Sequence, residues 1–390
     1  MKQVIKPIGI LGAFVISLTL MSQVIPSAEN QKHFIESPKT ESESKIQAAI
    51  LLDVSGSMSG LIEQAKAQLW NMVSTMGKAS CNGKVPQIEI ALYEYGRTGN
   101  DEKAGYVKQL SGFTTDLDKL SGELFALTTH GGDEYCGHVI HTSLNELQWD
   151  SAASSYKVIF IAGNEDFLQG KVHFTKACEA ARKKGVIVNT IYCGDRMQGI
   201  REHWNLSGEC GNGSYTNINH NARAEEIPTP YDSTILTLNE HLNGTYIAYG
   251  YAGKEASIAQ TKVDKMNYTM SKSAALKRAE VKGKKSLYKN THWDVVDAVE
   301  QDLKFLDKVD LKTLPDSLQN KSRDDLKKIV IAKKVQRDSI QTEIGKLSAQ
   351  RETFIKVEKA KKTSATVATL ETEIEKIVRK QAALYKMIIP

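Results

Sequence analysis

Three oxygen-bearing side chains, Asp53, Ser55 and Ser57, alternate along five residues of the sequence. They follow a short apolar run, Ala48–Leu52, and precede a segment, Leu61–Met76, in which apolar residues recur at helical spacing. After a buried strand, one carboxylate and two hydroxyls on a single turn can face one point. Such hard oxygen donors suit Mg²⁺, Mn²⁺ or Ca²⁺ rather than zinc. The competing interpretation is that these residues only cap the next helix and fill a turn.

The surrounding pattern alternates strands with helices. Apolar runs predict strands at residues 48–52, 88–95, 158–162 and 186–192, with shorter strands at 106–110 and 214–218. Helical spacing predicts helices at residues 61–76, 117–127, 139–147, 174–184 and 231–242, and a helical turn near 201–206. Parallel neighbouring strands need crossover connections, which helices of this length supply. We therefore predict an α/β domain with a doubly wound, mostly parallel sheet, in which ligands bind at the carboxyl ends of the strands.

The segment from about residue 47 to 250 resembles the von Willebrand factor type A (vWA) family. The resemblance rests on the strand–Asp53-x-Ser55-x-Ser57–helix segment, the Gly131-Gly132-Asp133 loop, and the segments 158–162, 188–194 and 213–215. It implies a Rossmann-type vWA domain over residues 46–250. It also implies that Asp53, Ser55 and Ser57 form the first loop of a metal-ion-dependent adhesion site (MIDAS). In that family the ion keeps an open coordination position that a partner's carboxylate fills.

The second and third loops depart from the family pattern. The family usually has Thr after the glycine pair of the second loop, where this chain has Asp133 and then Glu134. The family's third-loop Asp is replaced by Gly163, which is followed by Asn164 and Glu165. We therefore expect a modified site with seven candidate ligands: Asp53, Ser55, Ser57, Asp133, Glu134, Asn164 and Glu165. Mg²⁺ is the first choice of ion and Mn²⁺ or Ca²⁺ the alternatives, while a degenerate site without metal is the competing interpretation.

No catalytic residues are predicted, and we expect no enzymatic activity. Cys136 and His138 lie two residues apart at the start of a predicted helix and would point in different directions. Residues 56–60 place Met58 where a nucleophile elbow has Ser. Neither a Walker A nor a GxGxxG motif occurs in the sequence.

Residues 1–28 have the pattern of a secretory signal. Lys2 and Lys6 precede an apolar stretch, residues 8–20, that is short for a membrane span. A polar linker, residues 29–45, follows. We expect an exported protein, periplasmic or secreted, with an uncleaved membrane anchor as the alternative.

Export would permit disulfides among the five cysteines, whose pairing the sequence does not determine. Cys178 lies in a predicted helix and is most simply a small buried hydrophobic residue. We expect one or two bridges among the other cysteines.

Residues 254–390 differ in composition from the rest of the 390-residue chain. They contain 30 Lys and Arg against 19 Asp and Glu, whereas the first 253 residues contain 21 against 27. Apolar residues at helical spacing predict a long helix over 324–359 and a second helical stretch over 368–388. We interpret residues 254–390 as a basic helical module, a hairpin or coiled coil, with a short bundle favoured by the broken heptads. Because its basic residues alternate with acidic ones, we expect solvated helix faces.

The composition is that of a globular protein, which excludes wholesale disorder and a disulfide-dense miniprotein. We expect a binding or adhesion-type protein that engages an acidic side chain of a protein partner through the cation. The C-terminal helices could mediate self-association or weak contact with an anionic membrane surface, and no nucleic-acid partner is expected. The alternative function is a metal-independent envelope scaffold that acts through the helical module.

Overall fold

The apolar run that precedes Asp53 forms the central strand β1 (Lys45–Asp53) of a six-stranded sheet with the order β3-β2-β1-β4-β5-β6. β1 pairs in parallel with β2 and β4, and only β3, at the edge, runs antiparallel to its neighbour. The remaining strands are β2 (Gln87–Tyr95), β3 (Lys108–Thr114), β4 (Tyr156–Gly163), β5 (Ile187–Cys193) and β6 (Tyr215–Ile218). This confirms the predicted doubly wound, mostly parallel sheet.

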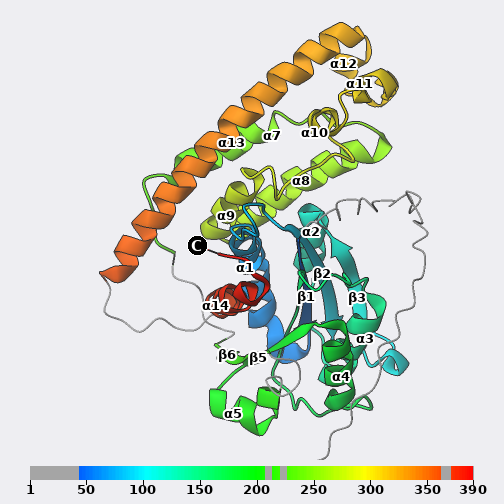
Figure 1. The fold of residues 1–390 in the computed structure, drawn as a ribbon, viewed down its shortest axis with the longest axis vertical. Helices are drawn as coiled ribbons and strands as arrows, with labels where there is room; N and C mark the ends of the chain where they lie inside the picture. Colours follow the sequence, from blue (N-terminus) through cyan, green and yellow to red (C-terminus); the bar gives the residue numbers. More distant parts are fainter. Residues whose placement is uncertain (1–43, 207–212, 220–225, 362–369, 390) are drawn as a thin grey trace, which may run out of the picture. The chain divides into compact units, whose positions relative to one another are not determined.

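The structure is a computed structural model, and it describes residues 44–206, 213–219, 226–361 and 370–389. These residues belong to one compact unit of the chain, Ser42–Pro390 (Figure 1). The predicted signal segment, residues 1–28, and nearly all of the predicted linker lie outside the described residues. No helix that the structure describes is long and apolar enough to cross a membrane.

Helices cover both faces of the sheet because alternate residues of each strand point to opposite sides. On β1, Ala48 and Leu52 join one hydrophobic core, whereas Ala49 and Leu51 join the other. The first core is covered by α1 (Ser59–Met76), α2 (Leu117–Ala126) and α14 (Leu370–Ala382). The second core is covered by α3 (Cys136–Glu146) and α4 (Phe174–Lys184), and α5 (Arg196–Arg201) packs against β5 and β6.

The described part of residues 254–390 is helical, as predicted. It contains most of α8 (Tyr251–Met270), together with α9 (Lys272–Lys282), α10 (Val295–Gln301), α11 (Phe305–Lys308), α12 (Asp316–Gln319), α13 (Arg323–Ala360) and α14. The helix predicted at residues 231–242 of the vWA-like segment corresponds to α7 (Asp232–Asn243). The predicted long helix corresponds to α13, which has 38 residues and packs against α7, α9 and α10. The second predicted stretch contains α14, which packs against α1 (red and blue in Figure 1). Val281 of α9 and Val378 of α14 are buried in the same core as Leu52, so the C-terminal helices complete the packing of the sheet.

Buried ion pairs join these helices to the sheet domain. Arg278 of α9 is 1% exposed, and its Nη1 lies 2.5 Å from Oδ1 of Asp118 on α2. Its guanidinium also pairs with Asp264 of α8 and lies over the Trp70 ring of α1, 4.6 Å from the centroid. The fully buried Lys282 places Nζ 2.9 Å from Oδ2 of Asp264. We call Asp118, Asp264, Arg278 and Lys282 the interface cluster.

Three expectations from the sequence are wrong. The expectation of solvated helix faces fails at Lys282, because Lys282 is buried and paired with Asp264. Cys178 is buried but is disulfide-bonded rather than simply a small hydrophobic residue. The expected bridge among the other cysteines is wrong, because Cys81, Cys136 and Cys193 are free thiols.

Candidate metal centre

Asp53 ends β1 at the point where the strand order reverses, between β2 and β4. This is the position at which open α/β sheets bind ligands. The side chain is fully buried, and its Oδ1 accepts a 2.7 Å hydrogen bond from the backbone N–H of Ser55. Its Oδ2 is buried without a hydrogen-bond partner among the described residues. Such an atom is costly to bury, so it points to a ligand that the chain itself does not supply.

The two serines of the first loop lie beside Asn164 of the third loop. The hydroxyl oxygens of Ser55 and Ser57 are 3.3 Å apart. The Ser57 hydroxyl oxygen lies 3.3 Å from Nδ2 and 3.4 Å from Oδ1 of Asn164, which directly follows β4. Ser55 is buried and Ser57 is exposed, so the group extends from the interior to the surface. We call the edge formed by these loops the rim.

The second loop brings Glu134, rather than Asp133, into the interior of the rim. Glu134 is 6% exposed and lies close enough to Ser55 and Asp53 for both to affect its pKa. Its side chain and that of Asp53 meet over Gly96, where an added Cβ would lie 2.7 Å from Glu134 Cγ and 3.1 Å from Asp53 Oδ1. Asp133 is exposed, and its Oδ2 accepts a 3.1 Å hydrogen bond from the Tyr135 hydroxyl. The two neighbouring acids therefore have different environments.

The third loop has no room for the aspartate that the family carries. A Cβ added to Gly163 would lie 2.5 Å from the Tyr95 hydroxyl oxygen and 3.0 Å from Asp53 Oδ2. Tyr95 is fully buried at the end of β2 and donates a 3.0 Å hydrogen bond to the carbonyl of Ala162. The space next to Asp53 is thus filled by a tyrosine hydroxyl. Glu165 is exposed on the third loop, and its backbone carbonyl accepts a 2.7 Å hydrogen bond from Trp204.

The buried acids of the rim have raised pKa values. Burial and, to a smaller extent, the charge of Glu165 raise the pKa of Asp53 to about 7, against the opposing effects of Ser55 and of the backbone of Asn164. Burial also raises the pKa of Glu134 to about 8, with added repulsion from Asp53, Glu165 and Asp133. The charged neighbours that shift these two pKa values are all carboxylates. Two buried acids that repel each other are stabilised by a cation placed between them.

The donor set fits a hard divalent cation. Among the described residues, no group of three or more His, Cys, Asp or Glu side chains is placed to hold a metal ion. Hydroxyl and amide oxygens would therefore have to complete the coordination beside the carboxylates of Asp53 and Glu134. Ser55, Ser57 and Asn164 supply such oxygens, and a cation held by this set would satisfy the unpartnered Oδ2 of Asp53.

Tyr95 and Gly96 shape the rim, although the sequence analysis assigned neither to it. The available signal was their place at the end of a predicted strand, and the register pairs Asp53 directly with Tyr95. Gly96 has a φ of +81°, a conformation that glycine adopts without strain. The position of Tyr95 at the end of a predicted strand does not show that its hydroxyl fills the space beside Gly163.

The environment of Cys136 does not suit a nucleophile. The residue begins α3, is fully buried, and lies with its sulfur 3.8 Å from the Tyr95 hydroxyl oxygen. Burial holds the pKa of its thiol well above the ordinary value. A reactive cysteine needs the opposite shift.

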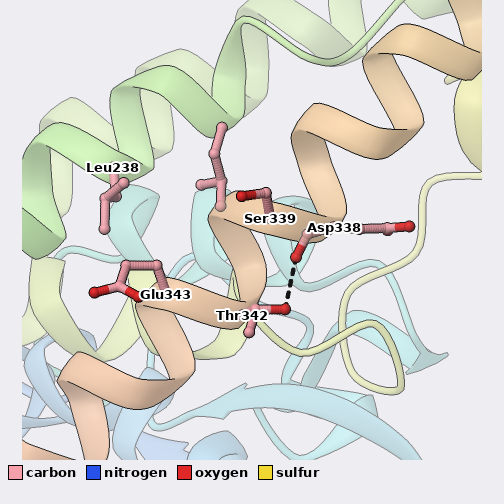
Figure 2. A pocket seen from close by; sticks show the side chains of 6 residues that line it. Leu238, Asp338, Ser339, Thr342 and Glu343 are labelled. Atoms are coloured by element: carbon pink, nitrogen blue, oxygen red, sulfur yellow. Dashed lines mark hydrogen bonds between the residues drawn. The ribbon is translucent and has the colours of Figure 1, made fainter.

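A pocket of about 520 Å³ lies between α7 and α13 (Figure 2). Its lining residues are Leu238, Asp338, Ser339, Ile340, Thr342 and Glu343. None of the rim residues lines it, so it is not part of the candidate site.

Comparisons with known proteins give matches among solved structures alone, since no family profile and no curated protein matches the sequence. The VWA domain of SpRpn10 aligns with 45% of this chain and 88% of its own, at 16% identity and a TM-score of 0.34. Proximal thread matrix protein 1 from the mussel byssus, with a zinc-occupied MIDAS motif, aligns with 45% of this chain and 42% of its own, at 13% identity and a TM-score of 0.34. An aerotolerance-related membrane protein from Bacteroides fragilis aligns with 45% of this chain and 93% of its own, at 16% identity and a TM-score of 0.31.

Similarity at this level carries no argument about binding or activity, and the chain spans less than half of the mussel protein's chain. The fold is evident in the molecule itself, from the sheet order, the single antiparallel edge strand and the helices on both faces. With Asp53, Ser55 and Ser57 at the point where the strand order reverses, the chain has a vWA-like fold.

Proposed function

We propose that this protein is a non-enzymatic binding protein that holds a divalent cation at the rim and engages an acidic side chain of a protein partner through that cation. One observation carries the proposal. Oδ2 of Asp53 is buried without a hydrogen-bond partner among the described residues, and a second buried carboxylate, that of Glu134, approaches Asp53 at Gly96. A bound cation supplies the missing partner, and a coordination position of that cation toward the surface would accept an acid.

Mg²⁺ is the ion that we propose first. Two carboxylates with hydroxyl and amide oxygens form a donor set without sulfur or imidazole, which favours Mg²⁺, Mn²⁺ or Ca²⁺. Mg²⁺ commonly keeps several waters and is held by one or two carboxylates, as Asp53 and Glu134 would do.

We also propose that the protein acts outside the cytoplasm, in the periplasm or after secretion. The signal-like pattern of residues 1–28 supports this. The disulfide at Cys178 supports it independently, because structural disulfides persist mainly in oxidising compartments.

Thermal unfolding with and without divalent cations tests the cation site. We expect Mg²⁺ or Mn²⁺ to raise the unfolding temperature of the full chain, because a ligand that binds only the folded state stabilises it. Asp53→Ala should abolish the shift. Asp324→Asn, a change of an exposed acid at the start of α13, should leave it intact. Absence of any shift in the unmodified protein with either ion would remove the proposal.

A metal-independent scaffold is the second candidate function. Ile331 and Val335 lie one turn apart on α13 and are 52% and 63% exposed, as expected of a surface for self-association. Light scattering in EDTA tests this function. A dimer that Val335→Lys dissociates would favour the scaffold, and a monomer in EDTA would exclude assembly through α13.

A further inference from the structure

We infer that Glu134 is an internal carboxylate ligand that occupies, at the cation, the position a partner's acid would otherwise take. The inference rests on the proposed cation site and adds a property to it. The rim is then closed to acidic partners until Glu134 withdraws. Glu134 thus sets which ligands the site accepts.

The third loop has no room for a side chain at Gly163, because the Tyr95 hydroxyl and Asp53 itself occupy the space. The adjacent Glu165 is exposed, and Asn164 is neutral. The third loop therefore places no carboxylate in the buried part of the rim.

Glu134 does reach the buried part of the rim. This residue is 6% exposed, and its Cγ and Asp53 Oδ1 both lie close to the position that a Cβ at Gly96 would take. Ser55, which donates its backbone N–H to Asp53, also lies close enough to Glu134 to affect its pKa. The two carboxylates thus approach each other at Gly96, near the same serine.

The loop that carries Glu134 holds it there. Its loop is fastened to the segment after β2, where Thr98 donates its backbone N–H to the Gly131 carbonyl at 3.1 Å. The Thr98 hydroxyl also donates to this carbonyl. Gly132 approaches the backbone so closely that an added Cβ would lie 2.6 Å from the Gly96 carbonyl oxygen. Glu134 is therefore positioned by backbone contacts and is not a freely rotating surface acid.

The charges of Asp53 and Glu134 also favour an ion that is closed to a further carboxylate. Asp53 and Glu134 together carry two negative charges, which balance a divalent cation. A third carboxylate, brought by a partner, would meet a neutralised ion and the exposed acids Asp133 and Glu165. Like charges within a few ångströms repel unless a cation compensates them. With a neutral residue in place of Glu134, the ion would keep a net positive charge toward a partner.

Mn²⁺ relaxivity tests this inference, with acetate as the carboxylate probe. Water proton relaxation reports the waters on bound Mn²⁺, and acetate lowers it when it displaces one of them. In the full chain loaded with Mn²⁺, we expect acetate to have no effect. In Glu134→Thr and Glu134→Gln, measured at Mn²⁺ concentrations that saturate each variant, we expect a higher relaxivity per bound ion and a fall on adding acetate. Glu102→Gln, the control for loss of an exposed acid outside the candidate ligands, should behave like the unmodified protein.

Failure of the inference differs from failure of the proposed function. Absence of Mn²⁺ binding in the unmodified chain would end the proposed function and the inference with it. Binding of Mn²⁺ with an acetate response as large in the unmodified chain as in Glu134→Thr would overturn the inference alone. Acetate-insensitive variants, or loss of Mn²⁺ binding in both variants, would also overturn it, since Asp53 and the serines should retain the ion without Glu134.

Discussion

Two groups of acidic residues in this molecule, the interface cluster and the rim, have opposite electrostatic environments. In the interface cluster, Asp118 and Asp264 are paired with Arg278 and Lys282. Burial alone would raise the pKa of Asp264, but the charges of Arg278 and Lys282 outweigh burial and hold it well below its usual range. At the rim, burial and neighbouring acids raise the pKa values of Asp53 and Glu134 to about 7 and about 8.

The chain supplies its own cations at the interface cluster but not at the rim. Buried acids that join helices to the sheet domain have basic partners from the same chain, and these contacts are complete without a ligand. The rim acids have only other acids as charged neighbours that shift their pKa values, and one oxygen of Asp53 has no partner among the described residues. Buried acids whose pKa values are raised and that have no basic partner are typical of a binding site rather than of a structural contact.

The largest effect is expected at the interface cluster. Arg278→Met should lower the free energy of unfolding by about 3–5 kcal/mol, because it leaves two buried carboxylates without their shared partner. Denaturant unfolding followed by circular dichroism measures the loss. As a matched control, Arg379→Met on α14 removes an arginine whose side chain is 31% exposed and should cost much less. A loss below about 1 kcal/mol in Arg278→Met would contradict the structural role of the cluster.

The next effect concerns the third loop. Gly163→Asp restores the family's residue type, yet it should lower the free energy of unfolding by about 1–3 kcal/mol, because the added Cβ meets the Tyr95 hydroxyl and Asp53. Thermal unfolding measures the loss. Tyr95→Phe in the same chain removes that hydroxyl and should recover part of the stability. Equal stability of Gly163→Asp and the unmodified protein would show that the tyrosine does not fill this space.

The pH dependence of stability should have opposite signs in the two regions. Because the folded-state pKa of Asp53 is raised from 3.8 to about 7 and that of Glu134 from 4.5 to about 8, the cation-free protein should lose stability as the pH rises through about 4 to 8. Glu280 of α9, which contacts Ser74 of α1 and the basic Lys277 and Lys284, has its pKa lowered from 4.5 to about 2 despite burial. Its contribution is present above pH 4.5 and lost as the pH falls toward 2.

Unfolding titrations in EDTA measure both slopes. Asp53→Asn should reduce the loss of stability between about pH 4 and 7 and leave the loss of stability below pH 4.5 unchanged. Glu280→Gln should reduce the loss of stability below pH 4.5 and leave the loss between about pH 4 and 7 unchanged. An unchanged slope in Asp53→Asn would show that the rim acids are not strained by burial.

The smallest effect is expected at Asp133. Because its side chain is exposed and contacts the Tyr135 hydroxyl, Asp133→Asn should change the free energy of unfolding by about 0.5 kcal/mol or less. It should also retain the cation-induced shift in unfolding temperature. Loss of that shift in Asp133→Asn would place this residue, and not only Glu134, at the ion.

The parts of the molecule that sequence predicted are those governed by periodicity. The apolar run before Asp53 and the helical spacing after Ser57 predicted β1 and α1, and with them the position of the first loop. The long helix α13 was predicted for the same reason. Each pattern extends over many residues, so a single atypical residue does not change the predicted element.

The roles of Glu134 and Arg278 could not be predicted in this way. Asp133 and Glu134 are adjacent acids in an irregular loop, and only the three-dimensional course of that loop decides which one turns inward. Arg278 and Lys282 lie in a helix rich in Lys and Ala, where charge usually indicates a solvated face, but packing against Trp70 and α8 buries them. The unpartnered acids of the rim and the paired acids of the interface cluster have the same residue types.

Calorimetric titration of Mg²⁺ into the full chain at about pH 7, in two buffers with different ionisation heats, tests the central claim most directly. With pKa values of about 7 for Asp53 and about 8 for Glu134, the rim retains protons at that pH, and a cation must displace them. We expect saturable binding at one site per chain, with proton release that disappears together with the binding in Asp53→Ala. Absence of binding, or binding that Asp53→Ala leaves unchanged, would contradict it.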